Sequence, residues 1–362
     1  MKKPKGRTIR SDLFEKLHDD IVISVLCKLS STANSPSDFI AVLLTCKRLN
    51  KLGLHPLVLS KSCSKTFAIR AKNWSPEAHR FLKLSVSAGN TEAYYILGMI
   101  RFYCLQNRGS GASLLAKAAI RSHAPALYSL ALIQFNGSGG LKNDKDVSAG
   151  VALCARAAFL GHIDALRELG HCFQDGYGVP KNISEGRRLL VQANARELAS
   201  VLCVFHNHHQ PPPLFINSSR TRNQTDFVSD SEFWLFNNDY GFNLTGREIH
   251  PANKFMVEWF GLGEDGNSGP GNLDPGLRMC SYVGCGRPET RKNEFRRCSG
   301  CGKVNYCSRG CQAHDWRVHH KVECAPMEQW MGHAIDDVEE ANHMNEEDVD
   351  VMDDQTVEIE EN

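Results

Sequence analysis

Metal-binding residue types are concentrated in one stretch of 45 residues near the C-terminal end of the chain. The stretch holds seven cysteines and two adjacent histidines: Cys280, Cys285, Cys298, Cys301, Cys307, Cys311, His319, His320 and Cys324. Six of the cysteines form pairs separated by two to four residues, and His320 lies four residues before the seventh. Thiolates and imidazoles at such spacings are typical ligands of structural zinc.

Two sets of four ligands account for this stretch better than disulfides do. Seven cysteines cannot all pair, whereas seven cysteines and one histidine supply four ligands to each of two tetrahedral Zn²⁺ ions. A helix over the later part of residues 308–323 would place His320 and Cys324 on one face, so His320 is the expected imidazole ligand. His319 and His314 are weaker candidates. Because protein ligands fill every position, we expect zinc that stabilises the fold rather than catalytic zinc.

An internal repeat precedes the cysteine-rich stretch and predicts the scaffold that carries it. Three copies of an Ala-x3-Leu-Gly/Ala pattern begin at Ala93, Ala126 and Ala165, at offsets of 33 and 39 residues. Periods in this range are typical of stacked helical hairpins, in which small residues let helices approach closely. We expect an α-solenoid over 65–203, with its repeat units in 89–195. Such a solenoid offers a concave surface for a protein partner or acts as a rigid spacer.

Residues 11–57 read as two amphipathic helices. Asp19 or Asp20 can cap the first, and Ser35 can cap the second after a break at Pro36. Helical periodicity gives the expected buried residues as Ile21, Val22, Val25, Leu26 and Leu29 in the first helix and Phe39, Leu43, Cys46, Leu49 and Leu52 in the second.

Charge and composition mark the remaining segments. Residues 1–10 carry five basic and no acidic side chains, and 334–362 carry thirteen acidic side chains but no Lys or Arg. We expect a basic arm at 1–10 and a disordered acidic tail at 327–362, which either stays solvated or folds onto the basic stretch 291–297. Residues 206–277 read as a linker with a short aromatic helix near 251–260.

Composition also excludes several classes of protein. No run of 18 apolar residues indicates a membrane span, and no apolar segment follows the basic arm as in a secretory signal. We therefore expect a nuclear and/or cytoplasmic protein with reduced thiols. From 278 to 326 there are ten basic and four acidic residues, and seven thiolates on two Zn²⁺ ions subtract three charges. The remaining charge of about +3 makes nucleic acid an unlikely partner.

The sequence from Tyr306 to Cys324 closely resembles a MYND-type zinc finger. The resemblance implies that Cys280, Cys285, Cys307 and Cys311 hold one zinc, and that Cys298, Cys301, His320 and Cys324 hold the other. It also implies a partner peptide that is proline-rich or acidic, with Trp316 and Tyr306 as candidate lining residues. The gap between Trp316 and His320 is one residue longer than in most members, which leaves a switch to His319 open. A RING domain would place the histidine fourth among the ligands, whereas here it is seventh.

Residues 11–57 are similar to an F-box, although His18 follows Leu17 where most F-boxes have proline, and 89–195 resemble Sel-like repeats. The order of F-box, Sel-like repeats and MYND finger resembles a family of plant F-box proteins. That resemblance implies a substrate-recruiting subunit of an SCF-type cullin ubiquitin ligase, which binds a Skp-type adaptor through 11–57 and performs no catalysis itself. A scaffold or transcriptional adaptor without a ligase, and nucleic-acid binding by the finger, are the alternatives.

The expected protein is therefore mainly α. It consists of a helical F-box, an α-solenoid of Sel-like (tetratricopeptide-like) repeats, a small two-zinc MYND finger at 280–324, disordered linkers and an acidic tail.

Overall fold

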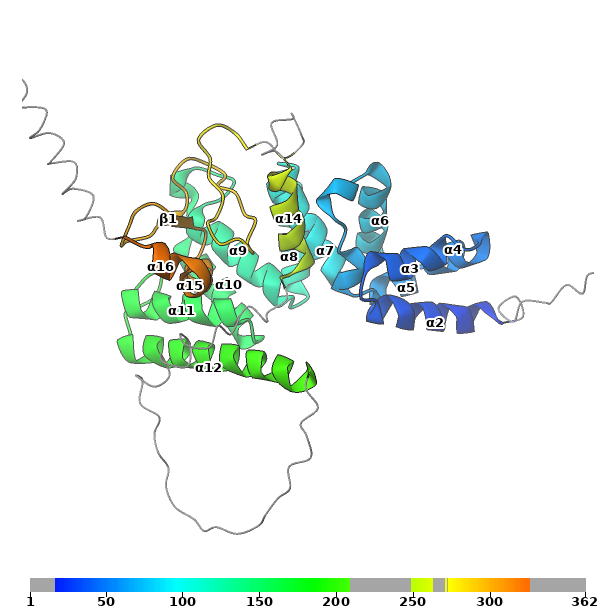
Figure 1. Ribbon diagram of the computed structural model, residues 1–362, viewed down its shortest axis with the longest axis horizontal. Coiled ribbons are helices and arrows are strands. Elements are labelled where there is room, and N and C mark those ends of the chain that lie inside the picture. The colour runs from blue at the N-terminus through cyan, green and yellow to red at the C-terminus, as the bar shows by residue number, and fades with distance from the viewer. Residues whose placement is uncertain (1–16, 209–248, 263–270, 272, 326–362) are drawn as a thin grey trace, which may run out of the picture.

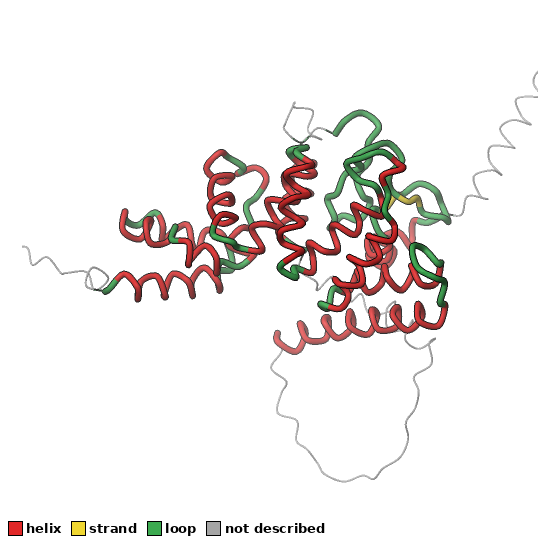
Figure 2. The backbone as a smooth tube through the Cα atoms, turned by 180° about the vertical axis from the view of Figure 1, so that it is seen from behind, coloured by secondary structure: helices red, strands yellow, loops and turns green. Residues whose placement is uncertain are grey.

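The chain folds almost entirely into helices, which confirms the mainly α class (Figure 1, Figure 2). The computed structural model describes residues 17–208, 249–262, 271 and 273–325, without the side chains of 200–208. The predicted basic arm, the acidic tail and most of the predicted linker lie outside these residues. No helix in the described part of the chain is long and apolar enough to cross a membrane.

The α-helices, in chain order, are α2 (Asp19–Thr32), α3 (Pro36–Leu43), α4 (Lys47–Gly53), α5 (Pro56–Lys61), α6 (Pro76–Ser87), α7 (Thr91–Met99), α8 (Arg108–Ile120), α9 (Ala124–Asn136), α10 (Val147–Phe159), α11 (Ile163–Asp175), α12 (Ile183–His208), α14 (Pro251–Gly261), α15 (Arg309–Asp315) and α16 (Lys321–Glu323). Short 3-10 turns are η1 (Ser64–Phe67), η2 (Ala71–Asn73) and η4 (Lys142–Asp144), and π-helical turns are η3 (Ile100–Cys104) and η5 (Trp316–His320). Two short antiparallel strands, β1 (Arg296–Arg297) and β2 (Asn305–Tyr306), form a ribbon.

Helices α2 to α5 form an N-terminal unit with its own core. The buried side chains are Val22, Leu26, Phe39, Leu43, Leu52, Val58 and Leu59. Helix α5 contributes two of them, so the unit extends beyond residue 57. Ser35 starts α3 with a capping box, as predicted, whereas His18 rather than an aspartate precedes α2.

Two expectations for this unit were wrong. The second predicted helix is split, because Cys46 takes an extended conformation and its Sγ accepts the backbone N–H of Leu49 to begin α4. Cys46 is therefore exposed rather than buried. Ile21 and Val25 are also exposed, at 51% and 48%, because α2 turns the neighbouring Val22 and Leu26 toward the core.

The solenoid repeats one turn between the helices of each pair. Gly89, Ser122 and Gly161 all have left-handed backbones, with φ of 83°, 60° and 91°. Glycine tolerates this conformation best, and serine adopts it here at the same point of the repeat. The next residue caps the following helix through its side chain: Asn90 for α7, His123 for α9 and His162 for α11. His123 and His162 therefore act as helix caps in these turns and lie in neither group of candidate metal ligands.

Small residues bring paired helices into backbone contact. A Cβ on Gly111 of α8 would lie 2.6 Å from the Phe102 amide nitrogen and 2.8 Å from the Gly98 carbonyl oxygen. The same crossing recurs between α11 and α12, where a Cβ on Gly186 would lie 2.6 Å from the Gly170 carbonyl oxygen. Glycine is thus required at these crossings because backbone atoms occupy the space of a side chain.

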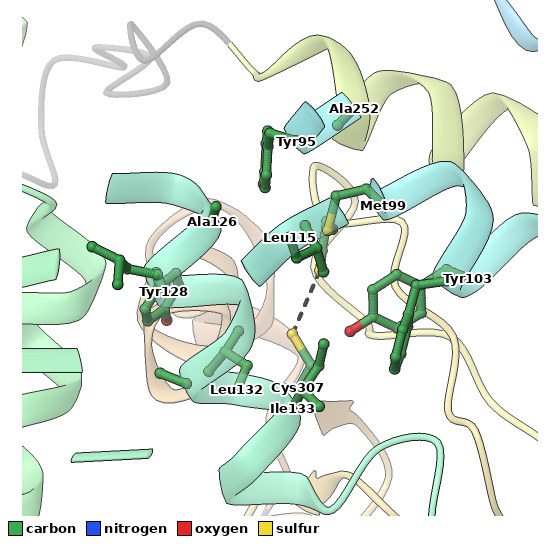
Figure 3. Packing of buried hydrophobic residues seen from close by; sticks show 14 of the residues in the cluster. Tyr95, Met99, Tyr103, Leu115, Ala126, Tyr128, Leu132, Ile133, Ala252 and Cys307 are labelled. Atoms are coloured by element: carbon green, nitrogen blue, oxygen red, sulfur yellow. Dashed lines mark hydrogen bonds between the residues drawn. The ribbon is translucent and has the colours of Figure 1, made fainter. Parts of the chain in front are cut away.

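The face formed by α7, α9 and α11 is covered by the chain itself. Helix α14 packs against α7 and η3, and α15 packs against α11. One hydrophobic cluster runs from the solenoid through α14 into the cysteine-rich segment. Figure 3 shows solenoid side chains meeting Ala252 of α14 and Cys307. The surface expected to receive a partner is therefore occupied within the described residues by α14 and residues 280–324.

Part of the predicted linker, 206–277, is helical within the described residues. Helix α12 runs to His208, so residues 206–208, predicted as the start of the linker, are helical. Helix α14 occupies the stretch predicted to form an aromatic helix, and its Glu258 accepts the backbone N–H of Ala71 at 3.0 Å. This helix joins the start of the solenoid to the C-terminal lobe.

Two glycines of α8 test the close helix crossing. Gly111→Ala should lower the free energy of unfolding by about 1–3 kcal/mol or more, because the new methyl group meets backbone atoms. Gly109→Ala is the matched control, since nothing lies within 4 Å of a Cβ there. It should change stability by less than about 1 kcal/mol, in the stabilising direction. Denaturant unfolding of both full-length variants is the measurement, and equal effects would contradict the crossing.

Candidate metal centre

The structure brings the eight predicted ligands together in two clusters. The clusters are Cys280, Cys285, Cys307 and Cys311, and Cys298, Cys301, His320 and Cys324. Within each cluster all four ligand atoms lie within 4.8 Å of one another. The division matches the one that the MYND resemblance implied.

The donor distances fit tetrahedral zinc. A Zn–S bond of about 2.3 Å places two sulfurs of a tetrahedron about 3.8 Å apart. The Sγ atom of Cys307 lies 3.5 Å from the Sγ atom of Cys285 and 3.6 Å from that of Cys311. In the second cluster, the Sγ atoms of Cys298 and Cys324 are 3.9 Å apart. Both clusters thus have the size and the donor chemistry that Zn²⁺ requires.

The β1–β2 ribbon interleaves the two clusters. Arg297 pairs with Asn305, so the turn between the strands holds the second cluster's Cys298 and Cys301, while Cys307 leaves β2 toward the first. The turn closes through a hydrogen bond from the Cys298 amide to the Val304 carbonyl, at 2.9 Å. Loss of either metal would therefore disturb the ribbon that supports the other.

Helix α15 positions the last ligand of the first cluster. Ser308 caps this helix, and its Oγ accepts the Cys311 amide at 3.0 Å. Cys307 and Cys311 thus flank the cap and point their sulfurs to one place. Tyr306, proposed as a groove residue, is instead buried and donates to the Asp315 carboxylate at 2.6 Å, whereas Trp316 remains partly exposed.

A π-helical turn selects His320 over His319. The turn spans Trp316–His320 and inserts one extra residue relative to regular α-helix. His320 is consequently buried, and its Nε2 lies 3.4 Å from the Cys301 sulfur, while His319 is exposed. The π-helical turn thereby accommodates the extra residue between Trp316 and His320. His314 faces the solenoid, with its Nε2 2.9 Å from Asp164 Oδ1, and is not in either cluster.

The first cluster is buried against the solenoid and carries excess negative charge. Four thiolates around one Zn²⁺ leave two negative charges. Arg287 lies beside them, with Nη1 3.7 Å from the Cys285 sulfur, and its Nη2 donates to Ser129 Oγ of α9 at 2.9 Å. Burial opposes the charge of this guanidinium, but the Cys285 and Cys307 thiolates raise the pKa of Arg287 well above its usual range. The arginine therefore joins the metal site to the repeats.

Further polar contacts hold the finger on the repeats. The Asn136 side chain of α9 donates to the Cys307 carbonyl at 2.9 Å. The Arg309 amide donates to Glu168 of α11 at 2.9 Å, and Arg291 donates to the Gly137 carbonyl at the end of α9, at 2.6 Å. These contacts fix the finger in one orientation on the solenoid.

The histidine pair provides a test of the ligand assignment. His320→Ala should leave one metal ion per chain, because it removes the only imidazole of the second cluster. His319→Ala should retain two, because this side chain is exposed. Native mass spectrometry of the two variants gives the counts directly. Loss of an ion from the His319 variant, with both retained in the His320 variant, would assign the ligand to His319.

Arg287 provides a test of the coupling between metal and repeats. Arg287→Met should destabilise the chain by about 3–5 kcal/mol, because a buried charge loses its partner. It should also speed zinc release to a chelator, whereas Arg297→Met, on the exposed strand β1, should change neither property. Thermal unfolding and chelator kinetics are measured on the same samples. Unchanged zinc release from the Arg287 variant would rule out its role as counter-ion.

Comparison with known proteins identifies the parts of the chain. Residues 280–324 match the MYND finger family, and 64–159 match plant tetratrico peptide repeats. The MYND finger binds two zinc ions, which fits the two clusters. A solved Sel1 repeat protein from Oxalobacter formigenes is 23% identical, covers 32% of this chain and 86% of its own, and has a TM-score of 0.29, too low to carry an argument.

Two relatives from Arabidopsis thaliana extend over nearly the whole chain. F-box protein At1g67340 is 60% identical over 331 residues, which cover 90% of this chain and 83% of the relative. F-box protein At5g50450 is 60% identical over 323 residues, covering 89% of this chain and 88% of the relative. The chain therefore belongs to this family of plant F-box proteins, with tetratricopeptide-like repeats and a C-terminal MYND finger.

Proposed function

We propose that the chain is a substrate-recruiting subunit of an SCF-type cullin ubiquitin ligase. In this proposal helices α2 to α5 bind a Skp-type adaptor, and the rest of the chain holds a target protein. Membership of the F-box family and an architecture of interaction modules support it. The chain would act without catalysis of its own, since its metal ions would have four protein ligands each and no open position for a substrate.

The observation that carries the proposal is the exposed apolar surface of the N-terminal unit. Ile21 and Val25 lie one turn apart on α2, and Leu44, just after α3, is 78% exposed. Ile40 of α3 and Leu57 of α5 are also exposed. A unit this small with several large exposed apolar side chains is typical of a protein–protein docking site. Helical periodicity marks Ile21 and Val25 as buried, and a bound adaptor would bury them.

The N-terminal unit is fixed to the solenoid, as a receptor of this kind requires. Asn90 is buried, and its side-chain amide donates to the carbonyls of Leu59 and Ser62, both at 2.8 Å. Its side-chain oxygen accepts the Ala93 amide at the start of α7. One side chain therefore ties α5 to the first repeat helix. A target bound at the finger would be held at a set distance from the adaptor.

The target would bind on the outer side of the finger or the solenoid, because α14 and the finger cover the inner face. Trp316, Val318 and Val322 are exposed on the last helical segment of the finger. We propose this segment as a binding surface for the proline-rich or acidic peptide expected of a MYND finger. We also propose that the protein is nuclear and/or cytoplasmic, which imaging of the chain with and without residues 1–10 would test.

The competing function is a scaffold or transcriptional adaptor that uses the repeats and the finger without a ligase. It predicts that the purified chain does not bind a Skp-type adaptor at all. Nucleic-acid binding by the finger is a third function, and it requires sequence-specific binding that survives physiological salt.

A double substitution on α2 separates these functions. Ile21→Asp with Val25→Asp should weaken binding to a purified Skp-type adaptor at least about tenfold, since both side chains would lie in the interface. The melting temperature should not fall, because both residues are exposed. Lys83→Asp with Lys117→Asp, exposed on α6 and α8, is the control and should bind as the unmodified chain does. Leu26→Asp is unsuitable, because it would place a charge in the core.

Absence of adaptor binding by the unmodified chain would favour the scaffold. If the α2 variant binds the adaptor as tightly as the unmodified chain does, the adaptor docks on another surface.

A further inference from the structure

The finger presents a more basic surface than its composition suggests. Three of its four acidic side chains are buried, and each has a hydrogen-bond or ion-pair partner within the finger. Glu289 pairs with Arg278 at 2.9 Å, Glu294 accepts from Thr290 at 2.6 Å, and Asp315 accepts from Tyr306. Most of the basic side chains are exposed. Most carboxylates of the finger therefore form contacts in its interior, and its exposed side chains carry mainly positive charge.

The exposed bases gather on the β1–β2 hairpin. Lys292, Arg296, Arg297 and Lys303 are all exposed there, and we call these four residues the basic hairpin face. The guanidinium of Arg296 lies 5.2 Å from the ring centre of Tyr177, in the loop before α12, so the solenoid holds it in place. Arg296 is thus fixed on the side of the ribbon that meets the solenoid, and Arg297, its neighbour in β1, points to the other side.

The neighbouring solenoid loop lies within reach of the positive charges of the finger. Burial and the charges of Arg291 and Arg296 lower the pKa of Lys145, in that order of size. The same loop carries Lys142 but also the carboxylates of Asp144 and Asp146. The loop is thus close to neutral, and the excess positive charge belongs to the basic hairpin face.

The acidic tail leaves the described part of the chain beside this face. Cys324 ends the finger, with its sulfur 3.9 Å from that of Cys298, which directly follows Arg297. Its sulfur also lies 3.2 Å from the position of a Cβ on Gly300, in the hairpin turn. Eight residues, 326–333, separate the finger from the stretch with thirteen acidic residues. Fully extended, they span up to about 25–30 Å, which is enough to reach any part of the hairpin.

We propose that the acidic tail, residues 334–362, docks in cis on the basic hairpin face of the finger. Opposite charge and the position of the exit point favour this occupant. A short tether gives the tail an effective concentration on the order of millimolar, so that even weak attraction keeps the face occupied. The tail thereby acts as an internal competitor, and an acidic segment of another protein must displace it. This inference does not depend on the ligase role.

The test uses full-length chains and a labelled peptide of residues 334–362. One chain is unmodified, and a second has the thirteen tail carboxylates replaced by Asn or Gln. A third adds Lys292→Glu and Arg297→Glu to the neutral tail. The fourth adds Lys83→Glu and Lys117→Glu instead, which make the same change of charge on α6 and α8. Fluorescence anisotropy gives each affinity at low and at physiological salt.

The neutral-tail chain should bind the peptide at least about tenfold more tightly than the unmodified chain, because its face is free. The hairpin substitutions should remove that gain and the α6/α8 substitutions should keep it. Added salt should weaken binding, since exposed charges are screened beyond about 8 Å at 0.15 M.

Equal affinity of the unmodified and neutral-tail chains would overturn the proposal, as would equal loss from the hairpin and the control substitutions. Binding of duplex DNA but not of the peptide to the neutral-tail chain would also overturn it and assign the face to nucleic acid.

Carbodiimide cross-linking of the unmodified chain tests contact in cis. The reagent joins carboxylates to lysine amines that touch, so tail residues should be found linked to Lys292 or Lys303 within one chain. Tail cross-links found only at lysines outside the hairpin would contradict docking on this face.

Discussion

The charge of the first cysteine cluster constrains the arrangement of the whole C-terminal half. Four thiolates on one Zn²⁺ keep two negative charges, and burial makes such charge costly unless donors and cations surround it. The finger supplies Arg287 and the solenoid supplies Ser129 to anchor it. Because Asn136 of the solenoid also donates to the Cys307 carbonyl, neither part satisfies its buried polar groups alone. Small metal-binding modules have little core of their own, and this one completes its interior with the solenoid.

This coupling changes what the repeats can do. A solenoid face of stacked helices is commonly a binding surface, but here α7, α9 and α11 bind α14 and the finger. Figure 1 and Figure 2 show the N-terminal unit at one end of the molecule and the finger toward the other, where it lies against the later repeat helices. This covering favours the rigid spacer over the open binding surface, the two roles that the sequence allows. Surfaces for partners remain at the two ends.

The sequence predicts features that depend on local spacing and misses those that depend on distant neighbours. Cysteine spacing indicates the ligands, and the gap after Trp316, one residue longer than in most MYND fingers, marks the place of the π-helical turn. Helical periodicity finds the apolar face of α2 but cannot separate a core residue such as Leu26 from an exposed one such as Ile21. The docking of the finger is similarly hidden, because Arg287 and Ser129 lie 158 residues apart in the chain.

Rigid coupling between the ends has a physical consequence for target recruitment. A flexible tether spreads a bound target over many positions, and its effective concentration near a second site falls as the tether lengthens. Here Asn90 fixes the N-terminal unit to the first repeat, and α14 joins the start of the solenoid to the finger through Glu258 and Asn253. A protein bound at the finger, as proposed above, would then be presented to the adaptor on α2 to α5 from a narrow range of directions. Selectivity would come from which target surfaces face the N-terminal unit as well as from affinity at the finger.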